Sequence, residues 1–416
     1  MTNYTFTKVD VPAAAGTYQY ISVDGLDAAG DAVGSYGNVD GDGDGTFHGF
    51  IALDNSNGNG ITLDPPGSTN TSVGITASGI LYGDYTYLNH NYGFVDNGGV
   101  FTTFDYGIAE TAPPTVPIAI STDVDGVTNA GVVYGDYADY VINNGNQPGW
   151  QGFLNNNGVI TLISFPGANI TTLAGINSAG TIVGNYEIGG NTNAGLIGHG
   201  FVDNNGSFTS IDVPGAYATS VVGISDGGEI VGNYQDFSNN NWGFVDNNGV
   251  ITKINIAGAT STGVSAVNAA GEVVGYYADG GGNIHGFVDN GGVITPVDVP
   301  GATETDILGI NATGMISGYY DDASGNQHGF VGTLPTTTIE TAGSTSLVQV
   351  GNNYFLESNS TWTSPELTYG GAPLTAGEFP WTPIGAEQTS TGYEIALKYA
   401  AIGQYTVWNT DANGNV

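Results

Sequence analysis

One phrase recurs along this chain, and its recurrence constrains the fold more than any other feature. The stretch from His285 to Ala302 reads HGFVDNGGVITPVDVPGA, while HGFVDNNGSFTSIDVPGA begins at His199 and WGFVDNNGVITKINIAGA begins at Trp242. A phrase repeated at a fixed period predicts an architecture in which each copy builds one supersecondary unit.

Two markers count the units. Each unit carries a Gly-Phe pair, and a Gly-x-Tyr precedes each pair. The pairs are Gly49-Phe50, Gly93-Phe94, Gly152-Phe153, Gly200-Phe201, Gly243-Phe244, Gly286-Phe287 and Gly329-Phe330. The tyrosines are Tyr36, Tyr85, Tyr137, Tyr186, Tyr234, Tyr277 and Tyr320. Residues 1–334 therefore contain seven units, each about 43 residues long.

Each unit is predicted to form four short strands. In the unit that begins near Thr260, the segments GVSAVN, EVVGYYA, HGFVDN and VITPVDV are rich in Val, Ile, Tyr and Phe. Gly, Asn and Asp separate them, as hairpin turns require. Four strands in about 43 residues are typical of a propeller blade, so we predict an all-β, seven-bladed β-propeller. The alternative is a parallel β-helix, whose rungs are shorter and lack this four-part order.

The phase of the repeat predicts how the ring closes. The chain opens with YTFTKVDVP, a fourth-strand phrase, whereas the seventh unit ends at a third strand containing Phe330. We therefore expect Thr5–Val11 to pair with that strand and complete the last blade, which would remove two exposed sheet edges. The alternative is a chain boundary that falls by chance within a repeat.

Charge and composition exclude several classes of protein. The chain has three Lys, no Arg and 39 acidic residues, so its formal net charge is −36. We therefore expect no nucleic-acid partner, because nothing would neutralise phosphates. We also expect no membrane insertion, since no apolar run approaches about 18 residues. There is no Cys, which excludes disulfides and thiolate metal sites.

The repeated phrases resemble a known family. H-G-F followed by Asn-Gly, I-D-V-P-G-A, G-I-N-x-x-G and I-V-G-x-Y are similar to the bacterial extracellular HAF-repeat proteins over roughly residues 4–334. The chain departs from the family in having Tyr92, Gln151 and Trp242 where the family has His. The resemblance implies secretion and a repeat fold and names no activity. The start MTNYTFTKVDV lacks a signal-peptide pattern, so we expect an extracellular or cell-surface protein exported without an N-terminal signal peptide; the alternative is a cytoplasmic protein.

Residues 335–416 differ in style from the repeats. The phrases stop, and Trp362, Trp381 and Trp408 appear. The segment resembles a tail module of large calcium-dependent proteins exported by type I secretion. We predict a small β-rich C-terminal domain in which YEIALKYA is the only candidate for a short helix, and in which the final NTDANGNV reads as interrupted.

Insertions locate a candidate binding surface. In a four-stranded blade, the fourth-to-first and second-to-third connections lie on one face, which we call the variable face because its connections differ in length. The longest insertions are 37–47, 106–118, 138–149 and 187–198. We predict ligand binding there, since loops on a rigid scaffold carry function. The predicted ligand-binding residues are Glu110, Asp139, Tyr140, Trp150 and Glu187. The alternative is that these loops vary in length only because solvent-exposed loops tolerate insertions.

One motif points to a cation. Asp40, Asp42 and Asp44 alternate with glycines in DGDGDG, which lets a tight loop direct three carboxylates at one hard ion. Ca²⁺ prefers such oxygen ligands, so we predict a calcium site. An EF-hand is excluded because Ile51 stands where its Glu is required. A solvated acidic turn is the alternative.

Other titratable residues are ambiguous. The His before Gly-Phe, as in His199 and His285, occupies equivalent places in separate blades, so we interpret it as a hydrogen-bonding group of each blade. His90 lies outside this register and is expected to be exposed. Glu110, Asp136, Asp139 and Glu187 lie on or beside long loops and are the candidates for acid–base chemistry.

Two classes of function follow. The first is a secreted recognition or surface-structural protein that presents one propeller face to a glycan or an extracellular protein, stabilised by calcium. The alternative is an extracellular hydrolase or lyase that acts on polysaccharides through carboxylates of the variable face. A propeller fold does not decide between them.

Overall fold

The computed structural model describes residues 4–11, 20–38, 45–56, 58–106, 121–139, 149–188, 198–358, 365–370, 372–377 and 380–416. Within these ranges the chain is almost entirely β-structure, and the only helical element among them is a 3₁₀ turn, Asp54–Ser56. None of the described segments is a helix long and apolar enough to cross a bilayer.

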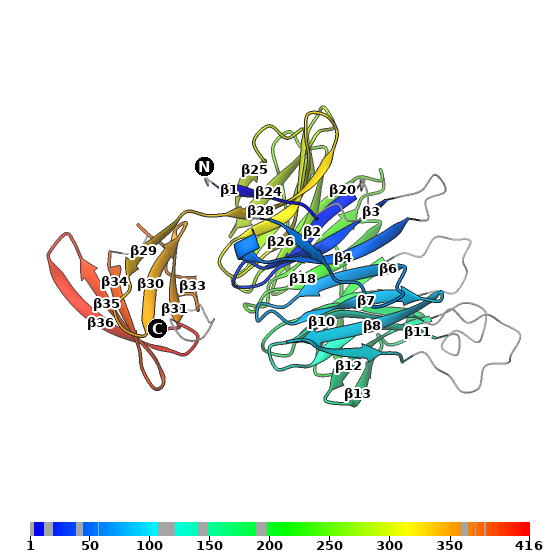
Figure 1. Ribbon diagram of the computed structural model, residues 1–416, viewed down its shortest axis with the longest axis horizontal. Helices are drawn as coiled ribbons and strands as arrows, with labels where there is room; N and C mark the ends of the chain where they lie inside the picture. Colours follow the sequence, from blue (N-terminus) through cyan, green and yellow to red (C-terminus); the bar gives the residue numbers. More distant parts are fainter. Residues whose placement is uncertain are drawn as a thin grey trace, which may run out of the picture.

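The N-terminal part is a seven-bladed β-propeller, as the repeat predicts (Figure 1). Blade 1 consists of β2 (Tyr20–Leu26), β3 (Ala32–Asn38), β4 (Thr46–Ala52) and β5 (Gly60–Thr62). Blade 2 consists of β6 (Asn70–Ile75), β7 (Leu81–Tyr87), β8 (His90–Asn97) and β9 (Val100–Phe104). Blade 3 consists of β10 (Thr122–Val127), β11 (Val133–Asp139), β12 (Gly149–Asn156) and β13 (Val159–Ile163). Blade 4 consists of β14 (Ile170–Ile176), β15 (Ile182–Glu187), β16 (Gly198–Asn204) and β17 (Ser207–Ile211). Blade 5 consists of β18 (Ala218–Ile224), β19 (Ile230–Gln235), β20 (Asn241–Asn247) and β21 (Val250–Lys253). Blade 6 consists of β22 (Ser261–Val267), β23 (Glu272–Ala278), β24 (Ile284–Asn290) and β25 (Val293–Val297).

Blade 7 confirms the predicted closure. It consists of β26 (Glu304–Ile310), β27 (Ile316–Asp321), β28 (Gln327–Thr333) and, as its outer strand, β1 (Thr5–Val9). The pairing is antiparallel and places Lys8 opposite Phe330. The Phe6 ring meets the buried Phe330 ring edge-on at 5.6 Å. The first strands of neighbouring blades contact one another around the whole ring.

The repeat forms blades because its local sequence encodes both the turns and the core. In the Asn-Gly turns, Asn205 and Gly206 adopt φ of 52° and 86°, the left-handed pair that a two-residue hairpin needs. The Phe of every Gly-Phe pair is buried, and in six blades its side chain is among the largest that are fully buried. The Gly before it allows close packing: a Cβ on Gly200 would lie 2.6 Å from Val221 of the next blade.

The remaining strands form a smaller β-domain beside the propeller (Figure 1). They are β29 (Thr336–Glu340), β30 (Thr345–Val350), β31 (Asn353–Ser358), β32 (Thr368–Tyr369), β33 (Ala372–Pro373), β34 (Thr382–Gln388), β35 (Gly392–Tyr399) and β36 (Gln404–Asp411). One core joins the two three-stranded sheets, with Leu347, Ile395 and Leu397 buried and Trp381 and Trp408 packed against it.

The suggested helix at YEIALKYA is wrong, because this segment is β35. Tyr393, Ile395 and Leu397 alternate inward along it, and β35 pairs with a strand on either side. Burial on one face of a sheet overrides the helix propensity of Glu, Ala, Leu and Lys.

Candidate functional site

Most of the residues predicted from the long loops lie outside the described parts of the chain. This applies to Glu110 and Tyr140 and to the proposed calcium ligands Asp40, Asp42 and Asp44. Asp139 is the last residue of β11, and the structure does not describe its side chain. Trp150 and Glu187 are described and lie where long insertions join the propeller.

The structure brings Trp150 and Glu187 together at the junction of blades 3 and 4. Trp150 of β12 forms a parallel bridge with Ile170 of β14, and Ile170 pairs with Glu187 of β15. Burial raises the pKa of Glu187. Its Oε2 is buried and has no hydrogen-bond partner among the described residues. The two residues therefore flank one backbone position on the variable face.

The histidines are held by carboxylates within the blades. Nδ1 of His199 lies 2.7 Å from Oδ1 of Asp212, and the His199 ring stacks on Tyr186 at 5.1 Å. The other histidine–aspartate pairs are His48–Asp64, His90–Asp105, His285–Asp279, His285–Asp298, His328–Asp10 and His328–Asp322. These contacts give the repeated His the structural role expected for it. His90, expected to be exposed, is partly buried beside Tyr92.

Blade 3 replaces both members of the pair. Gln151 stands in the His position and Ser164 in the Asp position. The Tyr137 hydroxyl donates to Oε1 of Gln151 at 2.7 Å, and Nε2 of Gln151 donates to Oγ of Ser164 at 2.7 Å. The hydrogen bond is thus retained without a titratable group, which supports a structural rather than a catalytic role.

Carboxylates gather instead on the inner strands of blades 7, 1, 2 and 3. This inner acidic group comprises Asp24, Asp84, Asp123, Asp125, Asp136 and Asp306. Burial raises the pKa of every member, to about 6 for Asp24, Asp84 and Asp306. Water reaches Asp24 and Asp125, yet the surrounding strands remove much of the solvation that their ionised forms need.

Asp125 and Asp136 form a hydrogen-bonded carboxyl pair. Burial, followed by the charge of Asp125, raises the pKa of Asp136, and burial raises the pKa of Asp125. Two carboxyl groups in contact cannot both ionise, so the pair shares a proton. Oδ1 of Asp136 also accepts the backbone N–H of Leu173 in blade 4 at 3.0 Å.

The equivalent positions of blades 4 and 5 explain the local structure. Asn185 accepts the N–H of Val221 at 2.7 Å and donates to the same residue's carbonyl oxygen at 3.0 Å. Asn233 binds both backbone groups of Val264 in the same way. Asp136 therefore occupies an interblade clamp position in which the donor of Asn has been replaced by a carboxyl group.

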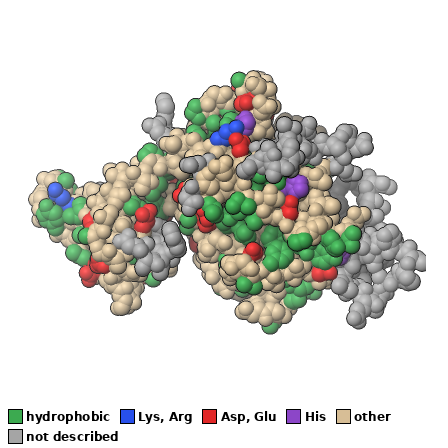
Figure 2. All heavy atoms as spheres, viewed as in Figure 1, with side chains coloured by type: hydrophobic (Ala, Val, Ile, Leu, Met, Phe, Trp, Pro, Cys, Tyr) green, Lys and Arg blue, Asp and Glu red, His purple; other side chains and the backbone are tan. Residues whose placement is uncertain are grey.

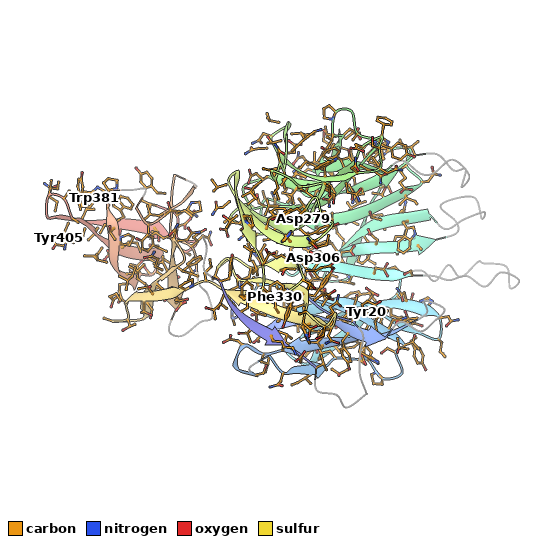
Figure 3. All side chains as sticks on the ribbon, turned by 90° about the horizontal axis from the view of Figure 1, so that it is seen from above. Tyr20, Asp279, Asp306, Phe330, Trp381 and Tyr405 are labelled. Atoms are coloured by element: carbon orange, nitrogen blue, oxygen red, sulfur yellow. The ribbon has the colours of Figure 1, made fainter. Side chains whose placement is uncertain are left out.

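A pocket of about 490 Å³ opens between blades 7 and 1. Its residues include Tyr20, Ser22, Ser35 and Phe47 from blade 1 and Tyr319 and Gln327 from blade 7. Phe47 and Gln327 stand at the starts of third strands, so the pocket opens on the variable face. Tyr20 is 45% exposed, and Figure 3 labels it together with Asp306 of the adjoining blade.

Two carboxylates, the buried Asp306 and the exposed Asp24, lie beside residues that line the pocket. The Tyr319 hydroxyl donates to Oδ2 of Asp306 at 3.2 Å. The Oγ atoms of Ser22 and Ser35 hydrogen-bond to each other at 3.3 Å, and both serines lie beside Asp24. Aromatic faces beside fixed polar groups are the combination that small-molecule pockets use for orientation.

Sequence reasoning missed Tyr20, Asp24 and Asp306. Blade 1 reads ISVDGL and has a register shift between Val23 and Gly25. The same shift recurs at the equivalent place in blades 3 to 7, and blade 2, which reads TSVGI, lacks it. The bulge is therefore a feature of the repeat and did not single out Asp24 as a site residue.

Comparison with known proteins gives one family match and several similar folds. The family described as "Tryptophan-rich Synechocystis species C-terminal domain" matches residues 345–416. No curated protein matches the chain.

Three solved structures illustrate the similarity in fold. The β-propeller domain of the Trilobed protease from Pyrococcus furiosus is 10% identical, with a TM-score of 0.48, and the match covers 76% of this chain and 95% of that one. A puromycin hydrolase is 11% identical, with a TM-score of 0.48, over 93% of this chain and 59% of the hydrolase. The Aleuria aurantia lectin, in complex with α-methyl-L-fucoside, is 12% identical, with a TM-score of 0.38, over 72% and 97%. These similarities concern the course of the backbone.

Proposed function

We propose that this protein is an extracellular recognition protein that binds a glycan in the pocket between blades 7 and 1. The observation that carries the proposal is the lining of that pocket, where Tyr20, Phe47 and Tyr319 occur together with the polar side chains of Ser22, Ser35 and Gln327. Aromatic rings present apolar faces to sugar rings, while hydroxyl and amide groups bind sugar hydroxyls. An extracellular protein ligand is the second partner that the variable face suggests.

The extracellular location and the calcium ion are parts of the proposal that rest on sequence. Support comes from the HAF-repeat resemblance, the absence of Cys and the net charge of −36. The DGDGDG motif with Asp40, Asp42 and Asp44 supports calcium. No group of three or more candidate metal ligands occurs among the described residues.

The proposal is tested by measuring glycan binding. We expect the wild-type protein to bind a defined set of oligosaccharides on a glycan array and by calorimetry, and Tyr20→Ala to weaken binding at least tenfold. Tyr405→Ala is the matched control, because Tyr405 is an exposed tyrosine of the C-terminal domain (Figure 3). Equal affinity in wild type and Tyr20→Ala would disprove the pocket as the binding site.

The carboxyl pair Asp125–Asp136 favours a second candidate, a polysaccharide hydrolase or lyase. A carboxyl that keeps its proton at neutral pH is suited to general acid catalysis, and an ionised neighbour is suited to base catalysis. Reducing-end or unsaturated-product assays on the oligosaccharides that bind would detect it. Turnover that Asp125→Asn abolishes, with binding retained, would establish the enzyme; bound sugars that remain intact would exclude it.

A further inference from the structure

The Tyr319 hydroxyl of the pocket between blades 7 and 1 has its proton engaged by a carboxylate. It donates to Asp306, and an ionised carboxylate accepts hydrogen bonds only. Ser22 and Ser35 hydrogen-bond to each other at 3.3 Å beside Asp24, so one of these two hydroxyls also has its proton engaged. The lone pairs of these oxygens and the exposed carboxylate of Asp24 are the acceptors offered to a ligand here.

Asp306 does not itself line the pocket, but it lies next to Tyr319, which does, and it carries an unsatisfied acceptor. Its side chain is 8% exposed, and its Oδ1 is buried without a hydrogen-bond partner among the described residues. Such an atom is unusual, because buried polar groups are nearly always paired. Oδ2 of the same carboxylate receives the hydroxyl proton of Tyr319, which lines the pocket. A donor that enters beside Tyr319 would complete this shell.

No Lys or Arg side chain of the described residues lines the pocket, so none of them acts as the donor to Asp306. Lys8 and Lys253 lie on the outer strands β1 and β21, Lys398 lies in the C-terminal domain, and the chain has no Arg. On the face drawn in Figure 2, Lys side chains show only at separated places, whereas Asp and Glu are spread over both domains. Oε1 of Gln327 accepts a hydrogen bond from the backbone N–H of Ile21 at 3.0 Å. The side-chain NH₂ group of Gln327 is therefore the hydrogen-bond donor that this residue offers in the pocket.

We propose that the pocket selects amino sugars, binding the free ammonium group of a glucosamine-type residue against Asp306, Asp24 and the hydroxyl oxygens that these carboxylates orient. This inference rests on the proposed glycan-binding function and names the class of glycan. A charged donor forms stronger hydrogen bonds with acceptors than a neutral hydroxyl does. Acidic sugars are disfavoured by the net charge of −36 and by the inner acidic group.

The aromatic side chains favour a sugar over a lysine-rich peptide as the source of the ammonium group. Tyr20 and Phe47 border the pocket beside the polar groups. They give a pyranose ring two apolar surfaces, while a lysine side chain would need only one narrow contact. The pH dependence provides an independent sign: burial raises the pKa of Asp24 and Asp306 to about 6, so ammonium binding should strengthen between pH 5 and pH 7.

The test compares three oligosaccharides of equal length on the wild-type protein by calorimetry. They are a β-1,4 glucosamine oligomer, its fully N-acetylated form and a uronic acid oligomer. We expect the glucosamine oligomer to bind at least tenfold more tightly than the N-acetylated form, and the uronic acid oligomer to bind weakest. The preference should rise several-fold from pH 5 to pH 7.

Substitutions of the two carboxylates test whether they cause the preference for the amine. Asp306→Asn and Asp24→Asn should each remove most of the preference for the amine while binding to the N-acetylated oligomer persists. Asp279→Asn is the matched control, since Asp279 is an exposed carboxylate in a loop of blade 6 (Figure 3) and its substitution changes the net charge equally. Thermal melts check that each variant is folded.

The outcomes separate this inference from the proposed function. Equal affinity for the amine and N-acetyl oligomers, both dependent on Tyr20, would overturn the amino-sugar inference and leave glycan recognition intact. A loss in Asp279→Asn as large as that in Asp306→Asn would attribute the preference to net charge and also overturn it. Binding of a lysine-rich peptide with no binding of any sugar would overturn both proposals.

Discussion

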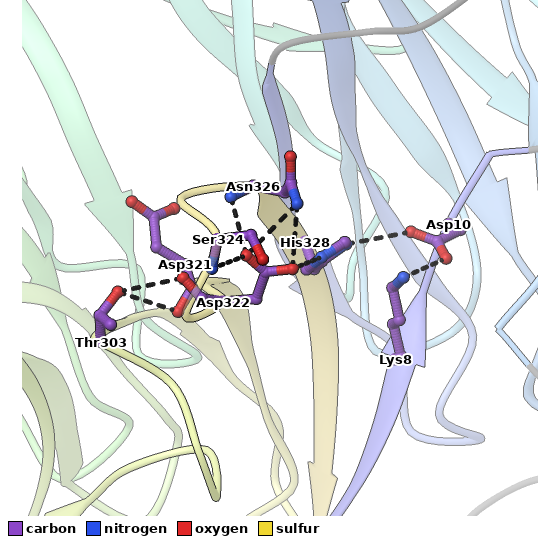
Figure 4. Close-up of polar contacts among 8 residues, drawn as sticks. All are labelled: Lys8, Asp10, Thr303, Asp321, Asp322, Ser324, Asn326 and His328. Atoms are coloured by element: carbon purple, nitrogen blue, oxygen red, sulfur yellow. Dashed lines mark hydrogen bonds and ion pairs between the residues drawn. The ribbon is translucent and has the colours of Figure 1, made fainter.

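Nδ1 of His328 lies 3.7 Å from Oδ1 of Asp10, which joins the last repeat to the start of the chain (Figure 4). The other oxygen of Asp10 forms an ion pair with Lys8 at 2.9 Å, and Nε2 of His328 meets Asp322 at 3.3 Å. In blade 4 the same relationship joins His199 to Asp212, both from a single repeat. The opening phrase KVDVP therefore supplies blade 7 with the aspartate that IDVPG supplies elsewhere.

Removal of the N-terminal strand should destabilise the whole propeller. Deletion of residues 1–12 would leave β28 as an unpaired edge and expose part of the core around Phe330 and Val331. Val9 is 1% exposed, and its burial together with that of Phe6 contributes on the order of 4 kcal/mol. We expect a large fall in melting temperature and soluble yield; an unchanged melting temperature would rule out the closure.

A disulfide provides the complementary check, because the native chain has no Cys. Thr5 and Thr333 pair directly across β1 and β28. Thr5→Cys combined with Thr333→Cys should crosslink on oxidation and raise the melting temperature. The single variants serve as controls, and reduction should reverse the gain.

The His285–Asp298 pair should show measurable coupling that depends on pH. Although burial lowers the pKa of His285, its hydrogen bonds with Asp298 and Asp279 raise the pKa above the usual value. Its contribution to stability is therefore complete below about pH 6.5 and is lost as pH rises through the raised pKa. A double-mutant cycle with His285→Gln and Asp298→Ser should give coupling of about 0.5–1 kcal/mol at pH 5.5.

The double variant that combines His285→Gln with Asp298→Ser reproduces the Gln151–Ser164 pair of blade 3. It should be less destabilised than the sum of the two single variants, and its stability should lack the wild-type loss above pH 6.5. Coupling of equal size at pH 5.5 and pH 9 would contradict a contribution from the charged histidine.

The substitutions Asp136→Asn in blade 3 and Asn185→Asp in blade 4 should change the folding stability in opposite directions. The folded state holds the proton of the Asp125–Asp136 pair more tightly than the unfolded chain does. The contribution of this pair to folding stability is therefore greatest below about pH 4, and it falls as pH rises through the raised folded-state pKa values. Asp136→Asn should restore the interblade donor and stabilise the protein by about 1–2 kcal/mol at pH 8.

The reverse substitution, Asn185→Asp, removes the donor to the carbonyl of Val221 and places a carboxyl group in the same environment. We expect it to destabilise the protein by about 1–3 kcal/mol at pH 8 and less at pH 4. Chemical denaturation at both pH values measures the two effects. Stabilisation by Asp136→Asn that is equal at pH 4 and pH 8 would contradict the shared proton.

Calcium should stabilise the protein if the DGDGDG loop binds it. Millimolar Ca²⁺ is expected to raise the melting temperature by binding the folded state preferentially. Asp42→Ala should remove that gain, whereas Mg²⁺ should reproduce little of it. An equal response to Mg²⁺ that Asp42→Ala leaves unchanged would indicate general screening of the acidic groups.

The C-terminal domain shows where local pattern was insufficient. YEIALKYA has residues with helix propensity, yet Ile395 and Leu397 alternate into a core built with Leu347 of the other sheet. Only the presence of that second sheet decides the period with which the segment buries its side chains. Trp381 and Trp408 pack against this core.

The sequence alone determined the seven blades, their four strands and the closure by Thr5–Val9, because period, turn residues and buried Phe are local and recur in every repeat. It also identified the His that Asp212 and its equivalents hold. Only the tertiary structure decided which side chains share a site. Tyr319 and Tyr20 come from opposite ends of the repeat series, and they line one pocket because ring closure sets blade 7 against blade 1. Proximity between blades depends on the packing of whole sheets, and no spacing along the chain records it.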